Sequence, residues 1–147
     1  MTVDLGELYQ ETILDHGRSP RNFGPLAGAT HRAEGFNPMC GDRFSVAIRV
    51  EDGRVAEARF EGQGCAISTA SASLMLEAMM GRPIGDFPGL FTTVHELLTS
   101  DRASGADPGK LIVFEGVRNF PLRVKCASLP WHTFKAALAR QDVASTE

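Results

Sequence analysis

The sequence predicts an α+β fold, a small three-stranded antiparallel sheet with helices packed on it. Two observations predict this class. Apolar and polar side chains alternate early in the chain, whereas helical spacing of apolar side chains dominates its second half. The length of 147 residues suits one domain with one hydrophobic core. We therefore expect residues 1–147 to form a single domain.

The first predicted helix covers residues 5–16. Apolar side chains recur there at helical spacing, Asp4 can cap the start of the helix, and Gly17 can end it. Residues 18–28 are rich in proline and glycine, which predicts an irregular connection.

The strongest strand signal is the alternation of apolar and polar side chains over residues 44–51. Asp52-Gly53 then predicts a tight hairpin turn, because this pair adopts positive φ at little cost, and residues 54–62 form the returning strand. Residues 29–35 add a third antiparallel strand. The alternation predicts an apolar face of the returning strand made of Ala56, Ala58 and Phe60.

Three helices are predicted in the second half. Residues 66–80 are rich in alanine, serine, leucine and methionine and end at a glycine followed by a proline. Residues 84–100 are helical with weakened first turns, because they contain two glycines and a proline. Residues 101–109 form an exposed loop, and the last helix covers residues 129–140 with Ser128 as its cap.

The composition gives no sign of a nucleic-acid-binding, membrane or secreted protein. Apolar residues make up 43% and charged residues 22%, and the net charge of −3 predicts neither a nucleic acid nor an anionic membrane as partner. No stretch approaches the roughly 20 apolar residues that span a bilayer. The first residues lack the basic and apolar parts of a secretory signal, so we expect a cytoplasmic location, in which thiols stay reduced.

Three cysteines are too few, and odd in number, for a disulfide framework. Cys40 and Asp42 form Cys-Gly-Asp before the first hairpin strand, Cys65 follows Gly-Gln-Gly directly before a helix, and Cys126 comes just before the last predicted helix. Three thiolates and one carboxylate would complete a tetrahedral zinc shell, and thiolates also suit iron–sulfur clusters. Because no Cys-x-x-Cys motif is present, the spacing leaves inert core thiols open as the alternative.

A second alternative is a nucleophilic Cys–His site, with Cys65 activated at a helix start. Four histidines offer a base, but none has a partner pattern that marks it as one. His16 and His95 are interpreted as helix-surface or half-buried residues, His132 lies one turn into the last predicted helix, and His31 lies in an edge strand.

Four segments carry a resemblance to a known family. They are Leu8-Tyr9…Ile13-Leu14-Asp15-His16…Pro20-Arg21-Asn22, then Asn37-Pro38-Met39-Cys40-Gly41-Asp42, then Phe60-Glu61-Gly62-Gln63-Gly64-Cys65-Ala66-Ile67-Ser68-Thr69-Ala70-Ser71-Ala72-Ser73, and Arg123-Val124-Lys125-Cys126-Ala127-Ser128-Leu129. The sequence resembles U-type iron–sulfur cluster assembly proteins, the family of the NifU N-terminal domain and IscU. The resemblance runs from about residue 5 to 140 and is weakest over 82–115.

Within this family the sequence is more similar to the Suf branch, SufU, than to the Isc branch. The segment between Cys65 and Cys126 is long, and Lys125 stands where the Isc branch usually has histidine. The Leu-Pro-Pro-Val-Lys segment of the Isc branch is also absent, and residues 120–125 take its place. Met39 replaces a small polar residue often found before the first cysteine.

The resemblance implies the three-stranded sheet with packed helices and a site in which Cys40, Asp42, Cys65 and Cys126 bind one Zn²⁺. It implies a PLP-dependent cysteine desulfurase as partner, with downstream iron–sulfur apo-proteins or a scaffold as recipients. Three hypotheses follow. The first is a zinc-dependent acceptor of persulfide sulfur, the second a scaffold that builds an iron–sulfur cluster on the same cysteines, and the third a structural zinc-binding module.

The first two hypotheses make the protein a sulfur-transfer partner or scaffold rather than a stand-alone enzyme. For sulfur transfer we predict Cys40 as the acceptor, because it lies in a loop flanked by proline and glycine, where backbone motion costs least. Arg123 is predicted as a supporting guanidinium that steadies a released thiolate or Asp42, with a solvated basic edge as the alternative.

Overall fold

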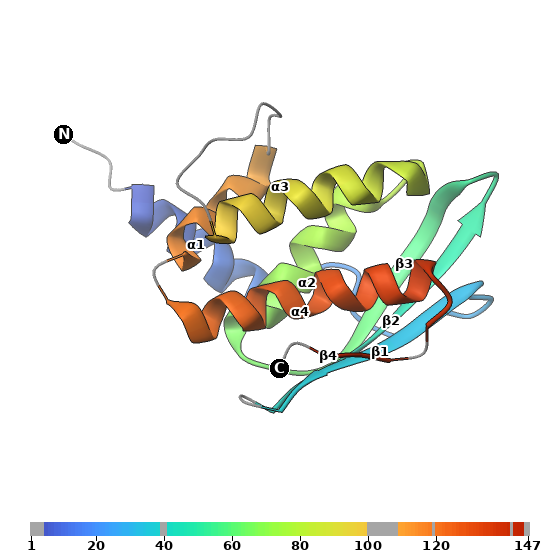
Figure 1. The fold of residues 1–147 in the computed structure, drawn as a ribbon, viewed down its shortest axis with the longest axis horizontal. Helices are drawn as coiled ribbons and strands as arrows, with labels where there is room; N and C mark the ends of the chain where they lie inside the picture. The colour runs from blue at the N-terminus through green and yellow to red at the C-terminus, as the bar shows by residue number, and fades with distance from the viewer. Residues whose placement is uncertain (1–4, 39–40, 100–108, 119, 142, 146–147) are drawn as a thin grey trace.

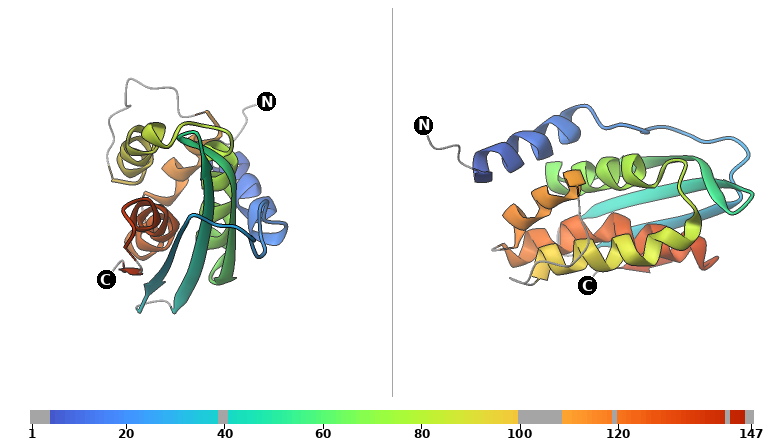
Figure 2. Two further views of the ribbon diagram at one scale, coloured as in Figure 1. Left: turned by 90° about the vertical axis from the view of Figure 1, so that its right-hand side faces the viewer. Right: turned by 90° about the horizontal axis from the view of Figure 1, so that it is seen from above.

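The computed structural model describes residues 5–38, 41–99, 109–118, 120–141 and 143–145. A layer of helices packs against one sheet (Figures 1 and 2). The elements are, in chain order, α1 (Leu5–Arg18), β1 (His31–Asn37), β2 (Asp42–Glu51), β3 (Arg54–Gln63), α2 (Ala66–Met79), the 3₁₀ helix η1 (Ile84–Asp86), α3 (Phe87–Thr99), the 3₁₀ helix η2 (Gly109–Val117), α4 (Pro121–Leu138) and β4 (Val143–Ser145).

The predicted three-stranded antiparallel sheet is confirmed. The strand order is β3-β2-β1-β4, and β2 pairs antiparallel with both β1 and β3. The third strand runs over His31–Asn37, two residues further along the chain than predicted. A short fourth strand that the sequence did not predict, β4, pairs parallel with β1 over residues 34–36.

The hairpin turn at Asp52-Gly53 has the expected positive φ angles of 52° and 74°. The predicted apolar face of β3 is wrong at one position, because Ala56 is exposed and Val55 is fully buried. The register shifts between Arg49 and Val50, so that Val50 pairs with Val55 and β3 carries one extra residue. Such a bulge reverses which residues of the strand face the core.

Helix α2 lies at the centre of the helical layer and contacts α1, α4 and β3. Helix α4 packs directly on β1 and β2. Gly35 of β1 makes this close approach possible, because a Cβ at this position would collide with the side chain of Thr133 on α4. The contact places the fully buried Trp131 and Phe134 of α4 in the core.

Of the two later predicted helix starts, one is confirmed and one is wrong. The weakened first turns after residue 83 are confirmed as η1, and the α-helix itself begins at Phe87. The predicted start of the last helix at residue 129 is wrong, because α4 begins at Pro121. Proline is favoured in the first turn of a helix, and the chain offers both Pro121 and Pro130 for that role. Of the predicted loop 101–109, only Gly109 lies within the described residues, and it begins η2.

His16 joins α1 to α2 inside the protein. The prediction of a surface or half-buried side chain is wrong, because His16 is only 1% exposed. Its Nδ1 lies 2.7 Å from Ser73 Oγ, and the same hydroxyl accepts a hydrogen bond from the Arg21 amide at 2.8 Å. Within the described part of the chain, His16 Nε2 is buried without a hydrogen-bond partner. The charged, doubly protonated ring would therefore have a buried N–H without a partner at Nε2.

Burial lowers the pKa of His16 below its usual 6.5, and the positive charges of Arg21 and Lys110 add to the effect. The unfolded chain therefore binds a proton at a higher pH than the folded chain does. Folding free energy from this group is fully present above pH 6.5 and is lost as the pH falls toward the lowered folded-state pKa. We expect His16→Gln to reduce the pH dependence of unfolding free energy below pH 6.5, by at most about 1.4 kcal/mol per pH unit.

Urea unfolding at several pH values between 5 and 8 would measure this slope. His31 and His132 also have pKa values lowered by burial, so part of the slope should remain in the His16 variant. The exposed Thr92 offers a control, because Thr92→Ala removes no titratable group and should leave the slope as in the wild-type protein. An unchanged slope in His16→Gln would show that this buried ring does not couple folding to pH.

Candidate metal centre

Cys65 caps the start of α2. Its backbone is extended, with φ −69° and ψ 168°, and its Sγ accepts a hydrogen bond from the Ser68 amide at 3.4 Å. The Ser68 hydroxyl lies 3.5 Å from the same sulfur and donates to the Cys65 carbonyl at 3.1 Å. The thiol thus occupies the place of the serine or aspartate oxygen that usually caps a helix. The predicted position of Cys65 at a helix start is confirmed.

Gly64 allows the chain to reach this position. A Cβ on Gly64 would lie 2.5 Å from Ser68 Oγ and 2.6 Å from the Phe44 ring. We expect Gly64→Ala to destabilise the protein by about 1–3 kcal/mol, the usual cost of overpacking, as measured by urea unfolding. Gly89→Ala is the matched control, because a Cβ there meets open space within α3. That change should be neutral or stabilising. Equal stability of the two variants would contradict the steric argument.

Asp42 begins β2 and turns its carboxylate toward Cys65. Its Oδ1 accepts the Cys65 amide hydrogen bond at 3.0 Å, and its Oδ2 lies 3.7 Å from Cys65 Sγ. Asp42 is 3% exposed, and no cationic side chain of the described residues forms an ion pair with it. A buried carboxylate is costly without a positive partner, so this position favours a bound cation.

Cys126 lies within α4 and is only 1% exposed. The prediction that it precedes the last helix is wrong, because α4 begins five residues earlier, at Pro121. Its sulfur nevertheless reaches the other two side chains. The ligand atoms of Asp42, Cys65 and Cys126 all lie within 4.8 Å of one another. The start of β2, the start of α2 and the first turns of α4 meet at one end of the molecule (Figure 1).

This donor set fits zinc. Bonds of about 2.3 Å in a tetrahedral site separate neighbouring sulfur ligands by about 3.8 Å, so contractions of about 1 Å would bring the three described donors into place. Two thiols and one carboxylate are ordinary zinc ligands, and thiols also hold iron–sulfur clusters. These three residues could therefore bind either group, with one further ligand required.

Cys40 and Arg123 are the other two predicted site residues. Cys40 lies outside the described residues, and its neighbours Pro38 and Gly41 are exposed. Arg123 is exposed on the first turn of α4, three residues before Cys126 and therefore on the same face of the helix. In the described structure Arg123 forms no ion pair with Asp42, and its supporting role stays a prediction.

The alternative Cys–His site has no support in the geometry. His16 bonds to Ser73, and His31 lies 2.8 Å from the Thr30 hydroxyl. His132 packs edge-on against Phe91, with ring centroids 5.2 Å apart. Across the described ranges of the chain, no hydrogen bond joins a histidine to a cysteine.

Sequence reasoning missed Ser68, although a signal was present. Capping side chains commonly interact with the residue three positions later, and Ser68 stands three positions after Cys65. Ser68 is completely buried, so its hydroxyl and amide form a fixed polar environment on one side of the sulfur. Ligand-orienting groups of this kind influence how strongly a metal is held.

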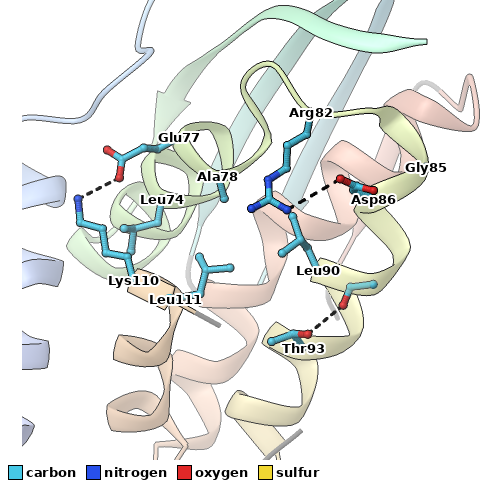
Figure 3. Close-up of a pocket in the computed structure, with 12 residues that line it drawn as sticks. Leu74, Glu77, Ala78, Arg82, Gly85, Asp86, Leu90, Thr93, Lys110 and Leu111 are labelled. Atoms are coloured by element: carbon cyan, nitrogen blue, oxygen red, sulfur yellow. Dashed lines mark hydrogen bonds and ion pairs between the residues drawn. The ribbon is translucent and has the colours of Figure 1, made fainter. Parts of the chain in front are cut away.

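A cavity of about 730 Å³ lies elsewhere, between α2, η1, α3 and η2 (Figure 3). Two ion pairs line it, Lys110–Glu77 at 2.9 Å and Arg82–Asp86 at 3.9 Å. Because each charged side chain already has a partner of opposite sign, the cavity has no excess charge directed at a ligand. It contains none of the predicted site residues.

A sheet with helices on it, and an Asp/Cys/Cys group at one end that could hold a metal ion, define a small α+β protein with a candidate metal centre. The family of the NifU-like N terminal domain matches residues 8–127. This match covers most of the chain, and the protein therefore belongs to that family. The predicted resemblance is confirmed.

Similar proteins carry names from both branches of the family. The chain is 42% identical to the iron–sulfur cluster assembly scaffold protein IscU of Thermotoga maritima, covering 90% of this chain and 94% of the relative. It is 34% identical to the zinc-dependent sulfurtransferase SufU of Bacillus subtilis, covering 95% of each. A crystal structure from Fervidobacterium islandicum, described as a putative scaffold protein for the SUF system, superposes with a TM-score of 0.83 at 30% identity, covering 92% of this chain and 99% of that one.

In the described residues, no helix is both long and apolar enough to cross a lipid bilayer.

Proposed function

We propose that this protein acts in cytoplasmic iron–sulfur cluster assembly as a zinc-dependent acceptor of sulfur from a PLP-dependent cysteine desulfurase. The observation that carries the proposal is the convergence of Asp42, Cys65 and Cys126 within 4.8 Å, with a buried carboxylate that lacks a cationic partner among the described side chains. Cys40 is the proposed fourth ligand. The similarity to a zinc-dependent sulfurtransferase named SufU supports the hypothesis of a zinc-dependent sulfur acceptor.

When bound, zinc would keep the thiol ligands deprotonated near neutral pH. One thiolate of this chain then attacks the outer sulfur of the persulfide on the desulfurase. A sulfur–sulfur bond forms on this chain, the bond to the desulfurase cysteine breaks, and that cysteine leaves as a thiolate. The step moves one sulfur atom and needs neither an oxidant nor a reductant.

Cys40 is the proposed acceptor because the other two thiols are held in place. Cys65 caps α2, and Asp42 and Ser68 contact its backbone and its sulfur. Cys126 is buried within α4. Arg123, exposed one helical turn before Cys126, is the proposed cation that steadies the Cys40 thiolate when it leaves the metal.

A scaffold that assembles an iron–sulfur cluster is the second candidate. The same cysteines would hold the cluster, and the 42% identity to a scaffold protein named IscU favours it. Lys125 in place of the histidine common in the Isc branch favours sulfur transfer instead. A purely structural zinc module is the third candidate, and the carboxylate ligand argues against it, because closed structural sites usually contain only cysteine and histidine.

Reconstitution separates these candidates. The metal-free protein would be given zinc in one sample and iron with sulfide in another, and each product assayed with a desulfurase and cysteine. We expect a colourless protein with one zinc per chain that raises desulfurase turnover. A stable coloured cluster formed in preference to zinc, with no effect on the desulfurase, would favour the scaffold. One zinc per chain with no effect on the desulfurase and no cluster would favour the structural module.

A further inference from the structure

Three serines of α2 are completely buried, and two of them bond to neighbouring helices. Ser68 contacts Cys65 at the start of its own helix. Ser73 bonds to His16 and to the Arg21 amide, and so connects α2 to α1 and the chain that follows it. Ser71 bonds to α4. A buried hydroxyl is costly unless it is paired, so the bonds of Ser71 and Ser73 each fix the position of one neighbour of α2.

The Ser71 hydroxyl both donates and accepts a hydrogen bond. It donates to the carbonyl oxygen of Ala127 and accepts a hydrogen bond from Trp131 Nε1 at 3.1 Å. Ala127 directly follows Cys126 in the sequence, and Cys65 caps the helix that carries Ser71. The hydroxyl therefore links the two helices that present the two described thiols, at a point next to one of them.

Near residue 127, α4 lacks one of its own backbone hydrogen bonds. Pro130 lies inside α4 and has no N–H, so the α-helical hydrogen bond from residue 130 to the carbonyl of Cys126 cannot form. The helix is therefore less constrained by its own backbone at Cys126 than elsewhere. The hydrogen bond from Ser71 of α2 to the carbonyl of Ala127 holds this segment from outside the helix.

We infer that Ser71 is a positioning residue that sets the separation of the Cys65 and Cys126 thiols for the metal, an inference that rests on the proposed metal site. Among the described residues, Ser71 forms no hydrogen bond with the side chains of Asp42, Cys65 or Cys126. It fixes α4 against α2 through Ala127, and the two sulfurs move with their helices. Removing the hydroxyl should change the geometry and affinity of metal binding, beyond any change in stability.

The test compares Ser71→Ala with Ser73→Ala. Both remove one completely buried hydroxyl from the same helix, but Ser73 contacts α1 instead of α4. We expect Ser71→Ala to weaken zinc binding by about 10–100-fold, the range for groups that orient metal ligands, and to change the visible absorption bands of the cobalt(II)-substituted protein. Ser73→Ala should lose stability but keep the wild-type zinc affinity and cobalt spectrum.

A third variant separates the two bonds of Ser71. Trp131→Phe removes the indole N–H but leaves the bond from Ser71 to Ala127. It should keep the wild-type cobalt spectrum. Wild-type affinity and spectrum in Ser71→Ala would overturn the inference, even if that variant were less stable. Failure of the wild-type protein itself to bind zinc or cobalt would instead overturn the proposed metal site.

A measurement on the unmodified protein covers the case in which Ser71→Ala does not fold. Trp131 is the single tryptophan of the chain, and its indole bonds to Ser71. If Ser71 fixes α4 against α2 beside the metal site, chelation of the metal should shift the tryptophan emission. The far-ultraviolet circular dichroism should stay constant. Emission that is identical with and without metal would contradict the inference.

Discussion

Serine in place of Cys65 should abolish the proposed zinc binding while preserving the start of α2. Serine is among the best helix N-caps, so its hydroxyl can accept the Ser68 amide hydrogen bond that the thiol accepts in the wild-type protein. A neutral hydroxyl is a poor replacement for a thiolate ligand. We expect zinc affinity to fall by more than about 100-fold, beyond the range for losing a group that only orients a ligand. Competition with a chromophoric chelator would measure the change.

The same variant predicts a change in stability. A ligand that binds only the folded chain stabilises it by about 2.7 kcal/mol when its free concentration is 100 times its dissociation constant. Chelation should therefore lower the melting temperature of the wild-type protein and leave that of Cys65→Ser unchanged. Without metal the two proteins should unfold at similar temperatures, because the helix cap is retained. One zinc per chain at wild-type affinity in Cys65→Ser would remove Cys65 from the ligand set.

Local signals predicted Cys65 correctly because each of them acts over a few residues. The predicted strand ends at Gly62, and the residues after Cys65 favour a helix. The sequence could therefore place this thiol at a helix start without information from other parts of the chain. The hairpin at Asp52-Gly53 was predictable for the same reason.

The position of Cys126 depended on interactions that local patterns do not contain. Ser128 and Pro130 resemble a helix start, yet α4 begins at Pro121 and continues through Pro130. Proline inside a helix costs about 3 kcal/mol. Burial of Cys126, Ala127 and Leu129 against the rest of the core offsets that cost. Such tertiary compensation cannot be recognised from propensities, and neither can β4, which consists of three residues added to the edge of β1.

The convergence of the site is a property of the fold. Asp42 and Cys65 are 23 residues apart, and their contact depends on the pairing of β2 with β3 and on the turn into α2. Spacing alone left inert thiols open as an alternative. The buried serines of α2 were equally hidden, because a serine in an alanine-rich helix gives no indication of its partner. His16 was misjudged for the same reason, since its partner Ser73 lies 57 residues away.

Cys40 is the thiol for which the proposed function makes its strongest prediction. The two described thiols have little freedom, since Cys65 is part of a helix cap and Cys126 is buried within α4. Displacing either one would break hydrogen bonds or disturb packing around α2 and α4. For sulfur transfer, one of the cysteines that would hold the metal must be free to meet the persulfide of the desulfurase. Cys40 can do so at the lowest cost, because its flanking residues Pro38 and Gly41 are exposed and belong to neither helix.

Cys40→Ala should therefore dock on the desulfurase but carry no labelled sulfur, a loss of essentially all transfer. The protein would be incubated with desulfurase and ³⁵S-cysteine, and peptide mass spectrometry would locate the persulfide in the wild-type chain. Docking would be measured separately by calorimetry with the desulfurase.

The matched control is Thr92→Ala, on the exposed side of α3, which should bind and carry sulfur like the wild-type protein. Because Cys65 and Cys126 remain in the variant, any transfer through them would still be detected. Persulfide on either of them in the wild-type chain, with Cys40 unmodified, would identify a different acceptor and would mean that a helix-bound ligand leaves the metal during the reaction.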